Sequence, residues 1–210
     1  RVEIKTIARQ LLEALVFAHA KNVVHTGRNV SNYFDTFQRL PNHNQILSHR
    51  IFCFLDLHPT STSPPSDYKI SPKAFRSPES WLGLPWGPSA DVWSFGAVIG
   101  SLMMGPYGEL FGSSAENEED AEIEILQKQN SMTGPYPLAL LQRVGGDWPA
   151  LFQVFADMDE DQTERVTWRL VVQELQLPEE DGAFIERVLK IDPAERPTAD
   201  ALLKDKWFSE

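Results

Sequence analysis

Residues 75–96 read FRSPESWLGLPWGPSADVWSFG and carry the strongest structural signal in the sequence. From Asp91 to Met104 nearly every residue is apolar. A helix without a polar face is a buried helix, so this pattern predicts a helix inside the core. Ser89 before it and Gly105 after it are residue types that favour helix ends. We therefore expect the rest of the chain to pack around this helix.

Two further segments flank this stretch. Residues 23–32 read VVHTGRNVSN, and residues 189–199 read LKIDPAERPTA, with KWF following at 206–208. In this order the segments resemble the C-terminal lobe of eukaryotic protein kinases, whose motifs H-R-D-L-x-x-x-N, A-P-E and D-x-W-x-x-G they match in part. The resemblance covers essentially the whole chain. It implies one domain, residues 1–210: a mainly α C-terminal lobe of the protein kinase-like fold, with a few short strands and no N-terminal β-lobe.

Finer features narrow this resemblance. Thr26 stands where the family usually has Arg after the loop His, and RSPE at 76–79 is followed by LGLPW at 82–86. Both features are similar to SR-protein-kinase-like Ser/Thr kinases, including fungal ones. The resemblance implies ATP-dependent phosphoryl transfer to protein Ser/Thr as the ancestral reaction, with ATP and Mg²⁺ as cofactors.

Four residues match structural positions of the family. The resemblance implies that Glu79 and Arg196 form a buried ion pair that fixes the activation segment. It also implies that Asp91 braces the catalytic loop from the start of the buried helix, and that His25 is a structural residue of that loop rather than a base. We therefore expect the scaffold of the lobe to be complete.

The catalytic positions depart from the family pattern. Gly27 occupies the position of the catalytic Asp and has no side chain that could accept a proton. Losing a positioned base typically costs a factor of about 10²–10⁴ in rate. Asn29 stands where the family places the loop Lys, so a positive charge near the transferred phosphate is lost; the neighbouring Arg28 is a poor substitute, since its side chain should point elsewhere. We predict an impaired enzyme.

Two residues remain as candidate Mg²⁺ ligands. Asn32 matches the metal-binding Asn of the catalytic loop. Asp56, in the sequence LDLH at 55–58, is the best match to the metal-binding Asp of the D-F-G motif, with His58 in place of the flexible Gly. Asp56 is either this ligand or an ordinary loop carboxylate.

The parts that would cover ATP do not occur in the sequence. It has no G-x-G-x-x-G loop and no V-A-I-K-type lysine, and a helical pattern begins almost at Arg1. We interpret the chain as starting inside a larger fold, or as a gene model that has lost its front half. Because the missing lobe would clamp the phosphates, we do not expect tight ATP binding by this chain alone.

Composition limits the partners. The chain has 19 basic and 30 acidic residues, a net charge of −11, which argues against nucleic acid or an anionic membrane surface as the main partner. No apolar run approaches the length of a membrane span. Cys53 is the only cysteine, so no internal disulfide can form and a reducing compartment, cytoplasmic or nuclear, is expected. A protein substrate or protein partner is the predicted ligand.

Two functions stay open at this point. The first is a Ser/Thr kinase that is catalytically impaired. The alternative is a non-catalytic interaction scaffold that uses the peptide-docking face of the lobe, where Trp81 and Trp86 are candidate contacts. A non-functional gene fragment is the third interpretation.

Residues 157–161 read DMDED and resemble the start of a calcium-binding loop. Such a loop also needs Gly and Glu where the chain has Gln162 and Trp168, so we do not predict calcium binding.

The remaining elements follow from periodicity. Apolar residues between Ile4 and Leu15 recur on one helical face, and this helix should end near residue 21, before extended residues 23–24. The acidic run at 116–124 predicts a solvated helix or loop surface. Residues 58–66 are predicted to form a loop without helix or strand. We predict a buried strand at 51–55 and helices at 137–144, 148–155, 164–173, 181–190 and 198–205.

Overall fold

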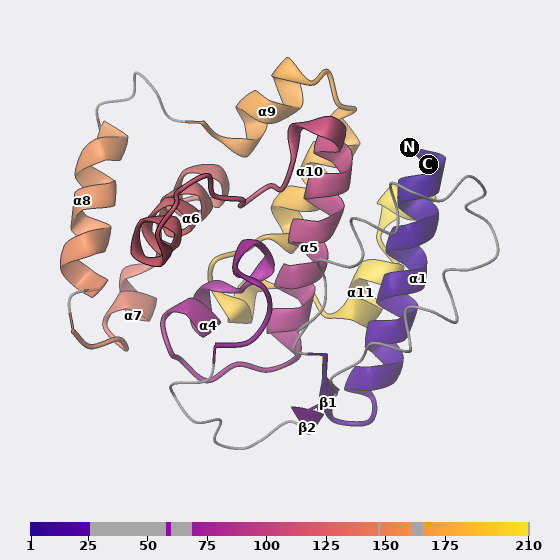
Figure 1. Cartoon of the computed structure of the whole chain (residues 1–210). Helices are drawn as coiled ribbons and strands as arrows, with labels where there is room; N and C mark the ends of the chain where they lie inside the picture. Colours follow the sequence, from indigo (N-terminus) through magenta and orange to yellow (C-terminus); the bar gives the residue numbers. More distant parts are fainter. Residues whose placement is uncertain (26–57, 60–68, 147, 161–165, 210) are drawn as a thin grey trace.

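In the computed structural model, helix α5 (Pro88–Met104) runs through the centre of the molecule, with the other helices around it (Figure 1). The structure describes residues 1–25, 58–59, 69–146, 148–160 and 166–209. Trp93, Ala97 and Ile99 on α5 are completely covered. The predicted buried helix and the predicted mainly α fold are both confirmed.

Helix α5 begins earlier than the sequence suggested. Gly87, not Ser89, is the N-cap residue, and Pro88 is the first helical residue. Proline fits this position because its fixed φ suits a helix and its missing N–H would have no partner there. The expectation for Ser89 was therefore wrong. Gly105 ends the helix at φ 60°, as predicted.

Helix α1 (Val2–His19) packs against α5 and against α11 (Ala199–Leu203), so that both chain ends lie on the same side of the molecule (Figure 1). Its buried face includes Ile7, Ala8 and Leu12, which belong to the predicted apolar stripe. A basic residue of α1 also contacts the C-terminal part of the chain: the Lys5 ammonium lies 5.1 Å from the ring centre of Trp207. A cation over an aromatic ring is attracted by its negative face.

Helix α10 (Glu179–Val188) approaches α5 very closely. A Cβ atom placed on Gly96 of α5 would lie 2.6 Å from Cγ1 of Val188, closer than real side chains pack. Glycine at this position therefore sets the distance between the two helices. Phe184 on α10 meets the ring of Phe95 on α5 edge to face and stacks on Trp207, with 4.1 Å between the ring centres of Phe184 and Trp207.

The strands are short. Val23–Val24 (β1) pairs antiparallel with His58–Pro59 (β2), and Val24 lies opposite His58. The prediction that no strand could form at 58–66 was therefore wrong for its first two residues, which find a partner far back in the chain. Residues 60–66 and the strand predicted at 51–55 lie outside the described residues.

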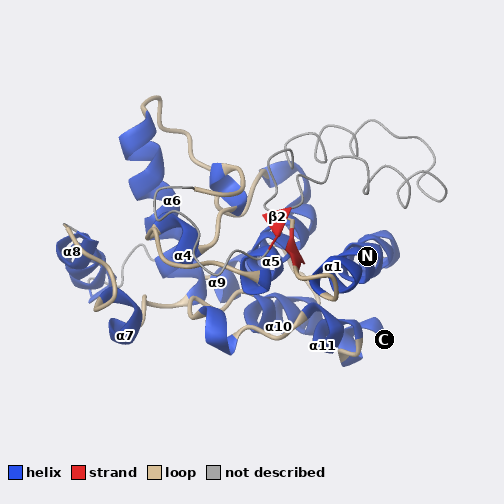
Figure 2. Cartoon of the chain, turned by 90° about the horizontal axis from the view of Figure 1, so that it is seen from below, coloured by secondary structure: helices blue, strands red, loops and turns tan. Residues whose placement is uncertain are grey.

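For the first part of helix α6 (Glu118–Thr133) the sequence left helix or loop open, and no helix was predicted beyond residue 124. Its N-cap Asn117 accepts a hydrogen bond from the Asp120 amide, and three acids occupy its first turn, where they favour the positive end of the helix dipole. The first part of the acidic run, through Asp120, is exposed, as predicted. Figure 2 shows α6 beside α4, away from α1.

The remaining helical segments are 3-10 turn η2 (Lys73–Phe75), α4 (Pro78–Trp81), η3 (Gly105–Tyr107), α7 (Leu138–Leu141), α8 (Trp148–Glu160), α9 (Trp168–Glu174), η4 (Pro193–Glu195) and η5 (Lys206–Phe208). Three of these helices, α7, α8 and α9, overlap predicted ones. The others were not predicted, among them α4, which begins within residues 76–79.

Candidate functional site

A buried ion pair joins two segments that are far apart in the sequence. The Glu79 carboxylate, on α4, accepts hydrogen bonds of 2.7 and 2.8 Å from the two terminal nitrogens of Arg196. The side chains are 1% and 0% exposed. This two-pronged geometry matches the planar guanidinium to the planar carboxylate. The structure thus places Glu79 and Arg196 in contact, as the family resemblance implies.

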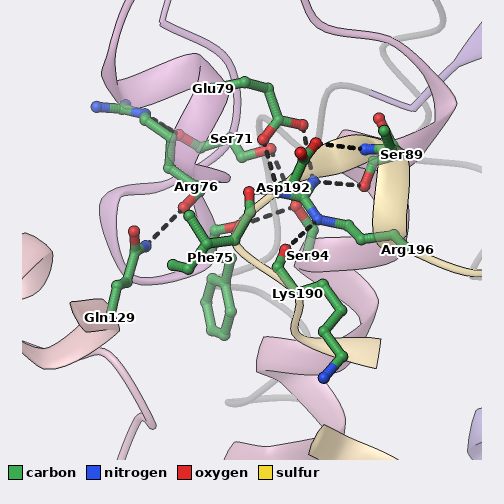
Figure 3. Close-up of polar contacts among 12 residues, drawn as sticks. Ser71, Phe75, Arg76, Glu79, Ser89, Ser94, Gln129, Lys190, Asp192 and Arg196 are labelled. Atoms are coloured by element: carbon green, nitrogen blue, oxygen red, sulfur yellow. Dashed lines mark hydrogen bonds and ion pairs between the residues drawn. The ribbon is translucent and has the colours of Figure 1, made fainter. Parts of the chain in front are cut away.

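The Arg196 guanidinium has no unsatisfied donor. Besides Glu79, it donates to the carbonyls of Ser89, Lys190 and Ile191, so that all five of its N–H groups are used (Figure 3). Its central carbon also lies 5.1 Å from the ring centre of Trp93 on α5. One buried side chain therefore ties together α4, the start of α5 and the segment after α10.

Asp91 contacts the backbone directly after β1. Its carboxylate, in the first turn of α5, is 4% exposed. The Oδ2 atom accepts a 2.8 Å hydrogen bond from the backbone N–H of His25 and lies 2.9 Å from Nε2 of His19. The geometry therefore fixes the backbone at the last described residue before Gly27.

The segment at residues 70–76 precedes α4 and has an unusual backbone. Ser71 adopts φ 66°, in the left-handed region that non-glycine residues rarely occupy. The buried Arg76 side chain donates from Nε to the Ile70 carbonyl at 2.9 Å and from NH2 to the Ser71 carbonyl at 2.9 Å. Burial lowers the pKa of Arg76, because the charged guanidinium is removed from water. This segment is therefore held by an internal clamp.

Trp81 does not lie on the surface. Its side chain is 1% exposed, and its ring is flanked by the Arg76 guanidinium at 4.3 Å and the Lys69 ammonium at 5.1 Å. The prediction that Trp81 lines a docking surface was therefore wrong, since the ring supports the 70–76 segment from inside. Trp86 is only partly buried and stays available as a contact.

The residues predicted for catalysis and metal binding, Gly27, Asn29, Asn32 and Asp56, lie outside the described residues. In the part of the chain that the structure describes, no group of three or more His, Cys, Asp or Glu side chains could hold a metal ion. No described helix is long and apolar enough to cross a membrane.

Sequence reasoning missed three residues of this site. His19 contacts Asp91, Arg76 clamps the 70–76 segment, and Gln129 on α6 donates from Nε2 to the Arg76 carbonyl at 2.9 Å. Arg76 belongs to the RSPE sequence at 76–79, and its place directly before that motif's Ser-Pro-Glu was the available signal. Nothing in the sequence pairs Gln129 with residue 76, because the contact spans two elements.

Comparison with known proteins gives concordant results. The chain is 26% identical to a serine/threonine protein kinase of Aspergillus fumigatus, over 98% of this chain and 57% of that protein. It is 25% identical to the serine/threonine-protein kinase AFC2 of Arabidopsis thaliana, over 98% and 53%, and 28% identical to the serine/threonine-protein kinase SKY1 of Saccharomyces cerevisiae, over 75% and 21%. The chain thus spans little more than half the length of the first two.

These relatives confirm the predicted resemblance to Ser/Thr protein kinases of the SR-protein-kinase-like type, fungal ones included. The protein kinase domain family itself matches residues 1–208. Since this match covers nearly all 210 residues, the chain belongs to the protein kinase domain family.

Proposed function

We propose that this chain binds protein partners through a kinase-type C-terminal lobe and transfers phosphate weakly or not at all. The observation that carries the proposal is the contrast between scaffold and chemistry. The Glu79–Arg196 pair and the Asp91 brace are complete, whereas Gly27 stands where a proton-accepting Asp is needed. A lobe that keeps these structural contacts but lacks the catalytic base is suited to binding a protein segment rather than to phosphorylating it.

Protein kinases use ATP and Mg²⁺, and the proposal assigns Asn32 and Asp56 as the residues that would hold the metal ion here. Asp56 comes two residues before His58, which pairs with Val24 next to the catalytic-loop entrance. This sequence position supports Asp56 as the ligand. A bound ion would offset phosphate charge, but no side chain at Gly27 could position the hydroxyl of a substrate.

The proposed partner is a basic segment of a protein in the cytoplasm or nucleus. The net charge of −11 favours a basic partner by long-range attraction. The resemblance to SR-protein-kinase-like enzymes makes a peptide of alternating Arg and Ser a reasonable probe. Trp86, partly exposed beyond α4, is the proposed anchor, because aromatic side chains with accessible faces dominate binding energy at interfaces.

Binding of a fluorescent Arg-Ser peptide, followed by anisotropy, tests this proposal. We expect Trp86→Ala to weaken binding about tenfold, in the range typical of an interface anchor. The matched control is Tyr107→Ala, which removes another exposed aromatic side chain, 72% exposed on η3, and should leave binding unchanged.

The metal-site variants separate docking from catalysis. Asp56→Ala and Asn32→Ala should bind the peptide as well as the unchanged chain does. Phosphate transfer from ATP to the peptide at an ordinary kinase rate, about 1–100 per second, that disappears in Asp56→Ala would contradict the proposal and identify a working kinase.

A further inference from the structure

The 70–76 segment keeps a strained backbone without an obvious local cause. Ser71 has φ 66°, and the two carbonyls around it are held by Arg76. None of the ion pairs between described residues includes Arg76; its buried guanidinium faces these carbonyls and the ring of Trp81. Strained backbone persists only where its surroundings over-determine it, and such strain concentrates at binding sites.

A residue outside the 70–76 segment also holds Arg76 in place. On α6, Gln129 donates to the Arg76 carbonyl at 2.9 Å, and its own side-chain oxygen accepts a 2.7 Å hydrogen bond from the Tyr136 hydroxyl. Figure 3 shows Gln129 reaching the Arg76 backbone from the side opposite to Glu79. Both residues are buried, and burial raises the pKa of Tyr136 well above its ordinary value, so its hydroxyl stays a donor.

We propose that Gln129 and Tyr136 are positioning residues that hold the 70–76 segment in its strained form through the Arg76 carbonyl. The guanidinium of Arg76 fixes the segment from within, and the two-step hydrogen-bond chain fixes Arg76 itself. We take the 70–76 segment, which precedes α4 and Trp86 in the sequence, as part of the docking face. That face would then be set by residues of α6 and the segment after it, which need not touch a partner. The role in docking rests on the proposed function; the role in holding the segment does not.

If Gln129 and Tyr136 only filled space in the core, replacing them would have a different effect from the one that a positioning role predicts. Gln129 and Tyr136 belong to the buried part of the molecule, so a packing defect at either would loosen neighbouring helices in general. A positioning role predicts loosening confined to the 70–76 segment, with the two residues acting in series.

Amide hydrogen exchange of the full chain distinguishes these cases. The Ile70 amide donates to the Ser80 hydroxyl and reports on the segment, whereas the Leu189 amide, bonded to the Ile185 carbonyl, reports on α10. We expect Tyr136→Phe and Gln129→Met each to speed exchange at Ile70 about five- to tenfold, the effect of losing one buried hydrogen bond. Exchange at Leu189 should not change.

Two comparisons make the result specific. The double variant should exchange at Ile70 no faster than Gln129→Met alone, because Tyr136 acts only through Gln129. The matched control is Thr133→Val, which removes a hydroxyl that bonds the Gln129 carbonyl within α6, and it should leave Ile70 unchanged. Equal acceleration at Ile70 and Leu189, or additive effects in the double variant, would overturn the inference.

The Arg-Ser peptide separates the inference from the proposed function. If the segment takes part in docking, both single variants should weaken peptide binding measurably, because a rearranged 70–76 segment no longer fits the peptide. If the unchanged chain binds no peptide, the docking function and the docking role of the two residues fail together, and exchange still decides whether they hold the segment. If the chain binds the peptide but both variants bind it equally well, the docking role alone is wrong.

Discussion

Replacing Glu79 with alanine is expected to lower the free energy of unfolding by about 3–5 kcal/mol, because it leaves the Arg196 charge buried without a partner. Neither side chain is exposed enough for water to replace the lost carboxylate. Arg196 also donates to the carbonyl of Ser89, in the first turn of α5, so the loss also loosens the start of α5. Chemical denaturation of the purified variant measures this change directly.

The control is a solvent-exposed ion pair, in which water can hydrate either side chain when its partner is removed. Asp200 and Lys204 form an i,i+4 pair on α11, with side chains 60% and 72% exposed. Asp200→Ala should therefore change stability by about 0.5 kcal/mol or less. If Glu79→Ala cost no more than Asp200→Ala, the buried pair would not be the support that the geometry indicates.

Replacing Asp91 with alanine is expected to cost roughly 3 kcal/mol, since the buried carboxylate accepts from both His25 and His19, and each bond to a charged group is worth about 1.5–3 kcal/mol. The loss should also speed hydrogen exchange at the His25 amide, which would be left without its acceptor. Denaturation and exchange of the same variant measure both effects. Normal protection of His25 in Asp91→Ala would show that Asp91 does not brace the loop.

The parts of the fold that the sequence predicted are those with local or motif-level signals. The buried helix around Trp93 was visible because it has no polar face, and the contact between Glu79 and Arg196 was implied by two short motifs. The N-cap was misplaced because Ser89 is a good capping residue, yet Pro88 fits the first helical position better.

What the sequence could not predict depends on contacts between distant segments. His58 forms a strand only because Val24 lies beside it, and the burial of Trp81 follows from cations that approach from residues 69 and 76. Helix α6 was not predicted in full because its acidic first turn fits a helix or a loop when its cap is not considered. The contact of Gln129 with the Arg76 carbonyl has no sequence signature at all.

The central claim, a complete scaffold with impaired chemistry, is tested most directly by a thermal-shift measurement with ATP and Mg²⁺. The chain and its Asp56→Ala variant are melted with and without the nucleotide and metal, since a ligand that binds the folded state raises its melting temperature. The account predicts a cooperative melt for both proteins, with no shift for either. A clear shift of the unchanged chain that Asp56→Ala abolishes would contradict it, because a working nucleotide site would then persist.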